Sequence, residues 1–269
     1  MKGHHMGPFK DIVVEQSGFV ALIEIRRPPN NFFDIALIRE IAGALEALDE
    51  DTCRAVVLAA QGKAFCAGAN FGDGSSLDGA GRMPDEPAQG TAGHLYLEAI
   101  RLFRTRKPIV AAVHGAAVGG GLGLALVADF RVTCPEARFC ANFTRLGFHP
   151  GFGLTTTLPE VIGKTNAALM FYTSRRVTGE EAYRMGLADM LVAQDQVRSA
   201  AQKLAAEIAE NAPLGVIATR ATMRADLADR VRLATEHELA EQTRLRLTDD
   251  FKEGVKAMAE RRVPDFACH

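Results

Sequence analysis

The residues best placed to do chemistry in this 269-residue sequence are three consecutive glycines, Gly119, Gly120 and Gly121. Glycine inside a helix costs roughly 0.5–1 kcal/mol relative to alanine, so some gain is expected to offset the triplet. Backbone N–H groups at a helix start have no partner within the helix. Without side chains in the way, they can face an anion or a developing negative charge. The triplet therefore predicts a turn that binds an anion or an oxyanion.

The elements that would position this turn follow an α/β pattern. Apolar runs at Ile109–Val113 and Phe130–Cys134 are typical of buried strands, and Leu122–Ala128 between them is typical of a helix. Strands alternate with helices early and helices alone follow, which favours an α/β core over residues 9–195 and a helical region over residues 196–269. The other expected elements are a hairpin of Ile12–Glu15 and Val20–Ile25, a helix from Asp34, a strand at Val56–Ala59, a long loop at 72–93, a helix at Leu95–Arg104, strands at Ala137–Ala141 and Ala188–Val192, and helices from Thr155, Ala167, Gly179 and Val197.

The composition argues against several classes of function. A net charge of −2 gives no electrostatic case for nucleic-acid binding, and no apolar run approaches the ~18 residues that a membrane span needs. The N-terminus lacks the apolar core of a signal peptide. Five scattered cysteines, none in a CxxC pair, and no cluster of metal-ligand residues indicate a cytoplasmic protein with reduced thiols and no metal site. Cys66 and Cys140 stand in apolar contexts and are expected to be inert core thiols.

Five motifs, spread over nearly the whole chain, resemble those of the crotonase superfamily, the enoyl-CoA hydratase/isomerase family. Their order along the chain is also that of the family. The motifs are Gly62–Ala69, Ala116–Gly121, Ala128–Arg131, Thr178–Ala182 with Gly186-Leu187, and Phe251–Gly254.

The resemblance implies a fold, an assembly and a substrate. The family fold is an α/β spiral of ββα units with a C-terminal helical region that mediates trimerisation, which gives a homotrimer or a hexamer made of two trimers. The substrate is an acyl-CoA thioester, so coenzyme A is part of the substrate and no cofactor is bound permanently. Two backbone N–H groups hold the thioester oxygen, and the matching positions here are Ala69 and Gly120. One preorganised donor of this kind can be worth ~3 kcal/mol when the oxygen becomes enolate-like.

The resemblance also places a set of residues beside the bound acyl-CoA. Some lie along the nucleotide and pantetheine, and Met258 and Arg261 reach the coenzyme A of a neighbouring subunit. Arg26 and Arg27 are candidate phosphate partners or solvated surface arginines. The full set of expected contacts is Asn31, Phe32, Ala67, Asn70, Phe71, Gly119, Gly123, Phe143, Met258 and Arg261.

The sequence departs from the family pattern at the two positions where hydratases carry glutamates. These positions are Gly123, two residues after the triplet, and Phe143, four residues after Phe139. General acid–base catalysis is usually worth 10²–10⁴-fold, and neither glycine nor phenylalanine can transfer a proton. Phe143 instead makes the acyl pocket drier and more apolar.

Three other residues are candidates for polar roles near the acyl group. His149 is an alternative acid or base, or else a turn histidine bonded to backbone. His94 follows the long loop and either reaches the pocket or begins a helix. Arg145 either binds an acidic substrate tail or forms a surface ion pair.

The sequence thus predicts an enzyme that acts on an acyl-CoA thioester through a backbone oxyanion hole, with His149 as the candidate acid or base, and that hydrates ordinary 2-enoyl-CoA very slowly. The alternative is a non-catalytic acyl-CoA binding or carrier protein of the same fold. A third reading is a histidine-dependent hydrolase of a diketone-like substrate without coenzyme A.

Overall fold

The computed structural model describes residues 4–5, 9–70 and 95–269. Most described strands belong to one large sheet, in which β1 and β2 pair antiparallel with their neighbours and the remaining strands run parallel. The sheet order is β1 (His4–His5), β2 (Ile12–Ser17), β3 (Val20–Ile25), β4 (Ala55–Ala60), β6 (Ile109–Val113), β8 (Phe130–Thr133) and β11 (Met190–Leu191).

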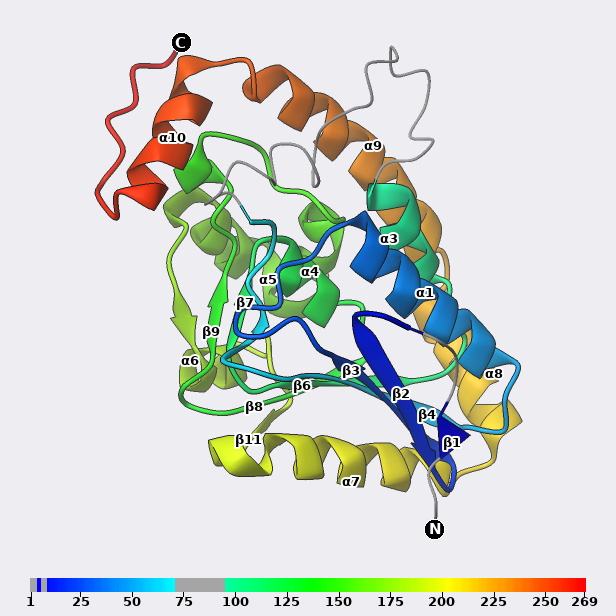
Figure 1. The fold of residues 1–269 in the computed structure, drawn as a ribbon. Coiled ribbons are helices and arrows are strands. Elements are labelled where there is room, and N and C mark those ends of the chain that lie inside the picture. The colour runs from blue at the N-terminus through cyan, green and yellow to red at the C-terminus, as the bar shows by residue number, and fades with distance from the viewer. Residues whose placement is uncertain (1–3, 6–8, 71–94) are drawn as a thin grey trace.

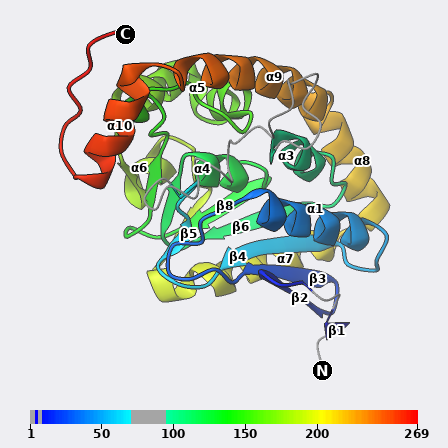
Figure 2. The same ribbon diagram turned by 45° about the horizontal axis from the view of Figure 1, so that its top comes forward.

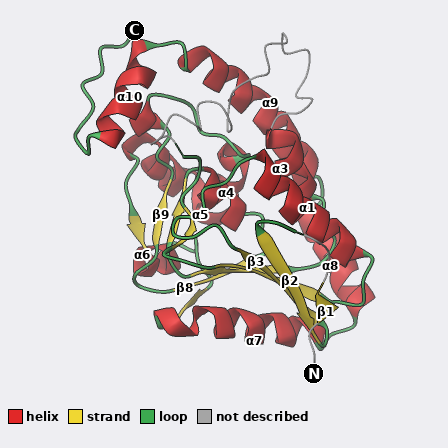
Figure 3. Ribbon diagram, viewed as in Figure 1, coloured by secondary structure: helices red, strands yellow, loops and turns green. Residues whose placement is uncertain are grey.

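The central parallel strands of this sheet, β4 and β6, are buried on both faces. Every residue of β4 and β6 is buried, as their continuous apolar sequences predict. Helix α1 (Ile35–Asp49) packs on one face against β2 and β3, and α7 (Val197–Ala209) packs on the other (Figures 1 and 3). Asp34 caps α1 by accepting a hydrogen bond from the N–H of Leu37 at 2.9 Å. The predicted hairpin and the helix from Asp34 are confirmed.

A second, smaller sheet was not expected from the sequence. It contains β10 (Val177–Thr178), β9 (Arg138–Cys140), β7 (Ala116–Val118) and β5 (Ala64–Cys66), in that order. Strands β5 and β7 run parallel, so the residues that follow them emerge at the same edge. Strands of two or three residues carry no readable periodicity, which explains why three of the four were not predicted.

Several expected element boundaries are wrong. Helix α4 occupies Gly120–Ala125 rather than Leu122–Ala128, and the last strand of the main sheet spans only Met190–Leu191. Helix α5 (Leu154–Thr173) contains both helices expected from Thr155 and Ala167, and Gly163, with φ of 76°, breaks the helix between them. Four further elements precede the C-terminal helices. They are α3 (Leu95–Phe103), the short 3₁₀ helices η1 (Thr144–Leu146) and η2 (Gln194–Gln196), and α6 (Gly179–Arg184).

The C-terminal helices wrap one side of the molecule (Figure 2). Helix α8 (Pro213–Arg224) is followed by α9 (Leu227–Leu245), which contacts α3 and α5, and by α10 (Asp249–Ala259), which contacts η1. Helix α7 lies within the expected C-terminal region but packs on the main sheet. The C-terminal helices that extend beyond this sheet are α8, α9 and α10. Among the described helices, none is both long and apolar enough to cross a membrane.

Candidate active site

The backbone segments after β5 and β7 lie in direct contact. A Cβ added at Gly68 would lie 2.6 Å from the carbonyl oxygen of Val118 and 3.8 Å from the nitrogen of Gly120. A Cβ at Gly121 would lie only 2.0 Å from the carbonyl oxygen of Cys66. Gly68 and Gly119 also have positive φ, 82° and 55°, which glycine adopts without strain. Glycine is therefore required here by close approach and by backbone conformation.

This contact brings two amides to the border of one cavity. Ala69 follows the turn after β5, and Gly120 is the first residue of α4, beyond the N-cap Gly119. The N–H of Gly119 donates to the carbonyl oxygen of Cys140 at 2.8 Å. Within the described chain, the amides of Ala69 and Gly120 donate to no acceptor. Gly120 lies at a helix start and Ala69 lies in a turn, and backbone donors without an acceptor are available to an oxygen atom of a ligand.

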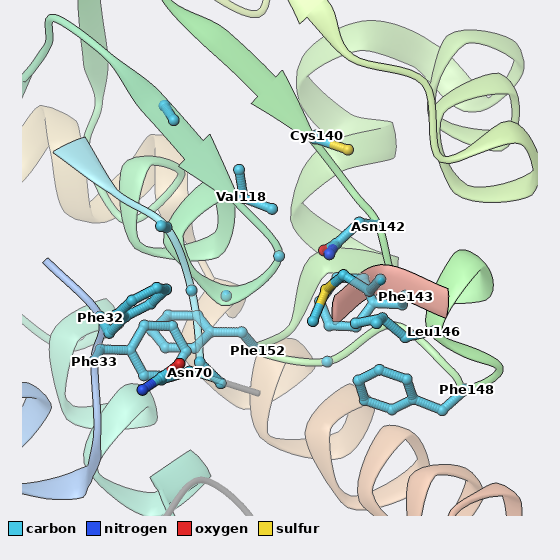
Figure 4. Close-up of a pocket in the computed structure, with 18 of the residues that line it drawn as sticks. Phe32, Phe33, Asn70, Val118, Cys140, Asn142, Phe143, Leu146, Phe148 and Phe152 are labelled. Carbon is cyan, nitrogen blue, oxygen red and sulfur yellow. The ribbon is translucent and has the colours of Figure 1, made fainter. Parts of the chain in front are cut away.

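The cavity that they border has a volume of about 630 Å³ and is lined mainly by apolar side chains and backbone. Figure 4 shows Phe32, Phe33 and Asn70 close together, with Phe143, Leu146 and Phe148 on the other side. Most of the residues expected beside acyl-CoA line it. They are Phe32, Ala67, Ala69, Asn70, Gly119, Gly120, Phe143, Met258 and Arg261.

Met258 and Arg261 line the cavity of their own chain, and their contact with the coenzyme A of a neighbouring subunit stays a prediction. They line it because α10 packs on η1 next to Phe143 and so brings its C-terminal end to the cavity.

Asn31 does not line the cavity, contrary to expectation. Its side chain is fully buried, donates to the carbonyl oxygen of Ala64 at 2.7 Å and accepts from the N–H of Arg27 at 2.9 Å. The residue has a φ of 50°, a conformation that asparagine tolerates better than most residues. Asn31 therefore holds the turn that precedes α1.

Gly123 is also absent from the lining because Phe152 covers it. A Cβ added at Gly123 would lie 2.6–2.9 Å from atoms of the Phe152 side chain. The Phe152 ring is buried and lies 5.7 Å from the ring of Phe33, and it borders the cavity in place of residue 123. Phe152, rather than Gly123, therefore faces the cavity at this point.

His149 lies outside the lining as well. Its Nδ1 is 2.8 Å from the carbonyl oxygen of Pro150, and its ring meets the ring of His237 edge-on at 5.8 Å. These contacts match the reading of His149 as a turn histidine bonded to backbone. Two further candidates, Phe71 and His94, lie outside the described residues.

Arg26, Arg27 and Thr155 form ion pairs and hydrogen bonds with other residues of the described chain. Arg27 pairs with Asp11 and Asp34, and Arg26 pairs with Glu24 at 2.7 Å. The hydroxyl of Thr155, at the start of α5, donates to the buried carboxylate of Glu238 at 2.6 Å. The same carboxylate accepts from the N–H groups of Gly153 and Thr155, so a side chain of α9 caps α5.

Asp129 also does more than end a helix. It accepts hydrogen bonds from Arg220 at 2.9 Å and Arg224 at 3.0 Å, and so ties α8 to the main sheet.

Polar residues that the sequence did not single out also line the cavity. The hydroxyl of Tyr96 donates to Oε1 of Gln242 at 2.8 Å, and Nε2 of Gln242 donates to the carbonyl oxygen of His149 at 2.9 Å. Arg246 lies one turn after Gln242 on the same side of α9. The others are Arg138, Asn142 and Arg176. Of these residues, only Asn142 could have been noticed in the sequence, because it directly precedes Phe143.

No side chain of the described lining titrates near neutral pH. The lining contains no Asp, Glu, His or Lys among the residues that the structure describes. Burial raises the pKa of the Cys140 thiol to about 11 and raises the pKa of Tyr96 as well. Burial also raises the pKa of Cys66 to about 12, in agreement with an inert core thiol. The site can therefore polarise a bound carbonyl group, but its described side chains are poorly suited to move a proton.

Comparison with known proteins agrees with this architecture. Residues 15–268 match the family model described as enoyl-CoA hydratase/isomerase. A 2,3-dehydroadipyl-CoA hydratase from Escherichia coli is 32% identical over 260 residues, which cover 95% of this chain and 98% of that protein. A probable enoyl-CoA hydratase from Bacillus subtilis is 30% identical over 92% of this chain and 95% of its own length.

The crystal structure of an enoyl-CoA hydratase/isomerase from Pseudoalteromonas atlantica T6c superimposes with a TM-score of 0.83 at 28% identity. The match covers 96% of this chain and all of that chain. The crotonase-like α/β fold with a C-terminal helical region, expected from the sequence, is confirmed.

Proposed function

The chain belongs to the enoyl-CoA hydratase/isomerase family, and we propose that it processes an acyl-CoA thioester whose carbonyl oxygen is held by the amides of Ala69 and Gly120. The observation that carries this proposal is the pair of amides that border one cavity and donate to no acceptor within the described chain. An enolate formed next to a thioester places negative charge on that oxygen. Each preorganised donor there can lower the barrier by about 3 kcal/mol.

Coenzyme A would lie along the residues that line the cavity near these amides, with Ala67, Asn70 and Phe32 on one side and Met258 and Arg261 on the other. A homotrimer or a hexamer is part of the proposal because the resemblance assigns that role to the C-terminal helices. No permanently bound cofactor is required, since the polarising groups are backbone amides.

Ordinary 2-enoyl-CoA hydration should be very slow in this protein. The positions that resemble the two hydratase glutamates are Gly123 and Phe143, and Phe152 fills the space beside Gly123. Loss of general acid–base catalysis usually costs 10²–10⁴-fold. The relatives are named as hydratases, so hydration is the activity that tests this statement most directly.

The experiment is a spectroscopic titration with 2,4-hexadienoyl-CoA, whose conjugated thioester absorbs at longer wavelength when its carbonyl oxygen accepts strong hydrogen bonds. We expect a red shift on binding, together with crotonyl-CoA hydration at least ~10²-fold slower than that of an ordinary hydratase measured in parallel. Binding without a red shift would contradict the oxyanion hole. Hydration at the ordinary rate would contradict the loss of acid–base catalysis.

The second candidate function is a non-catalytic acyl-CoA binding or carrier protein. It is favoured by the absence of Asp, Glu, His and Lys from the described lining. A product screen over acyl-CoA and aryl-CoA esters separates the two candidates. Tight binding with a red shift and no product from any ester would support the carrier.

A further inference from the structure

Gln242 of α9 is a buried, uncharged polar side chain in the wall of the cavity. Its relative exposure is 2%. Its Oε1 accepts a hydrogen bond from the hydroxyl of Tyr96 at 2.8 Å, and its Nε2 donates to the carbonyl oxygen of His149 at 2.9 Å. A carbonyl oxygen can only accept, so the second contact fixes which end of the carboxamide carries the nitrogen. The side chain is therefore held in one orientation from both ends.

One donor of this carboxamide is left over. Nε2 carries two N–H groups, and only the one directed at His149 has an acceptor among the residues that the structure describes. Buried donors without an acceptor are uncommon in native proteins, and each costs about 1–3 kcal/mol. The second N–H group of Gln242 is thus available to an acceptor atom that enters the cavity.

The nitrogen lies in the part of the wall that adjoins the proposed thioester site. A Cβ added at Gly151, which also lines the cavity, would lie 2.5 Å from Nε2 of Gln242. The nitrogen therefore occupies the space that a side chain at position 151 would take. The next residue in the chain is Phe152, whose side chain lies 3.5 Å from the place where a Cβ at Gly120 would be.

Helix α9 is fixed to this wall on both sides of Gly151. Glu238, one turn before Gln242, accepts from the N–H of Gly153 at 2.8 Å and from the N–H of Thr155 at 3.0 Å. The bond from Gln242 to the carbonyl oxygen of residue 149 holds the other side. A donor that is already fixed in place loses little entropy when a ligand binds to it.

We propose that Gln242 is a specificity-determining residue whose second N–H group donates to a carbonyl oxygen on the acyl chain, so that the preferred substrate is an oxoacyl-CoA thioester. The inference rests on the proposed function, because it presumes that the thioester lies at Ala69 and Gly120. A plain methylene chain offers no acceptor and would leave the buried N–H group unpaired. A site of this kind discriminates against an analogue that lacks the oxygen.

The proposal gives Gln242 a polar role for which the sequence offered other residues. Arg145, the candidate for binding an acidic tail, is exposed and does not line the cavity. His149 contributes its carbonyl oxygen, which holds Gln242 in place, rather than its ring.

The test is a calorimetric comparison of 3-oxohexanoyl-CoA and 5-oxohexanoyl-CoA with hexanoyl-CoA, esters of equal chain length that differ in one oxygen. Wild-type protein should bind at least one of the oxo esters about 3–10-fold more tightly than hexanoyl-CoA. Gln242→Met has a similar length and no N–H group, so it should abolish this preference and leave hexanoyl-CoA binding unchanged or tighter. Gln202→Met is the matched control, because it makes the same chemical change at an exposed position of α7 that does not line the cavity.

Equal affinity of the wild type for all three esters would overturn the inference, because water would then satisfy the donor. An equal loss for all three in Gln242→Met would also overturn it, since a merely structural role lowers every affinity alike. Gln242→Glu keeps an acceptor for Tyr96 but has no N–H group, and it should lose the preference as well, which provides a readout if Gln242→Met does not fold.

The same measurements separate this inference from the proposed function. If hexanoyl-CoA binds and 2,4-hexadienoyl-CoA shows its red shift while neither oxo ester is preferred, only this inference fails. If none of the esters binds, the proposed function fails with it.

Discussion

The two ends of the cavity are built in different ways. At the end with Ala69 and Gly120, backbone packs directly on backbone, and one added methyl group at Gly121 would collide with the carbonyl oxygen of Cys66. At the end with Phe143 and Arg246, side chains form the wall. The first end fixes two donors in space at little reorganisation cost. The second end can change what it binds when a single side chain is substituted. Binding of the thioester oxygen and selection of the acyl group therefore depend on different parts of the cavity.

Phe152 packs against the backbone end of the cavity. Its side chain lies 3.5 Å from the place where a Cβ at Gly120 would be, and it occupies the space beside Gly123. An acidic side chain at position 123 would therefore displace this ring before it could reach the substrate. The glycine at position 123 and the buried aromatic ring at position 152 therefore depend on each other, because a side chain at 123 would occupy the space of the ring.

The largest effect is expected from Gly121→Ala at the backbone end. The new methyl group would lie 2.0 Å from a backbone oxygen, which cannot move without shifting β5. We expect a loss of about 3 kcal/mol or more in the free energy of unfolding, measured in urea. The red shift of bound 2,4-hexadienoyl-CoA should be lost as well, since the donor of the neighbouring Gly120 moves. If the free energy of unfolding falls by less than about 1 kcal/mol and the red shift is intact, the backbone end is not packed as tightly as this comparison requires.

A smaller effect is expected from Phe143→Leu at the side-chain end. The residue is buried but borders the cavity, so we expect a stability loss of roughly 1–2 kcal/mol in the same urea experiment. The red shift of the bound dienoyl ester should persist, because the donors lie in the turn after β5 and at the start of α4. Loss of the red shift without unfolding would show that the two ends are coupled.

The smallest effect is expected from Gly43→Ala, which makes the same chemical change as Gly121→Ala in an open position. Gly43 lies within α1, and a Cβ there would have no atom within 4 Å. We expect the free energy of unfolding to rise by about 0.5–1 kcal/mol, with unchanged binding of the dienoyl ester. A destabilised Gly43→Ala protein would indicate that the effect of Gly121→Ala does not come from close packing alone.

The motifs predicted the backbone end of the cavity better than its side-chain end. Ala69, Asn70, Gly119 and Gly120, which the resemblance placed at the thioester and along coenzyme A, all border the cavity, because they follow two short parallel strands that end at the same edge. His149, the candidate acid or base, does not line the cavity. The turn after Gly147 directs its ring toward the carbonyl oxygen of Pro150 and the ring of His237. Proximity in sequence to Phe143 did not determine where that ring points.

By itself, the sequence determined the hairpin, helix α1, the α/β order and the turn formed by the glycine triplet. These features depend on periodicity and on backbone preferences within a few residues. Tertiary structure alone decided that Phe152 covers Gly123, that Asn31 serves a turn, and that Arg246, directly after α9, lines the same cavity as residues as early in the chain as Phe32. On a helix as polar as α9, a side chain that enters a cavity cannot be told from one in water, because only packing against distant elements separates them.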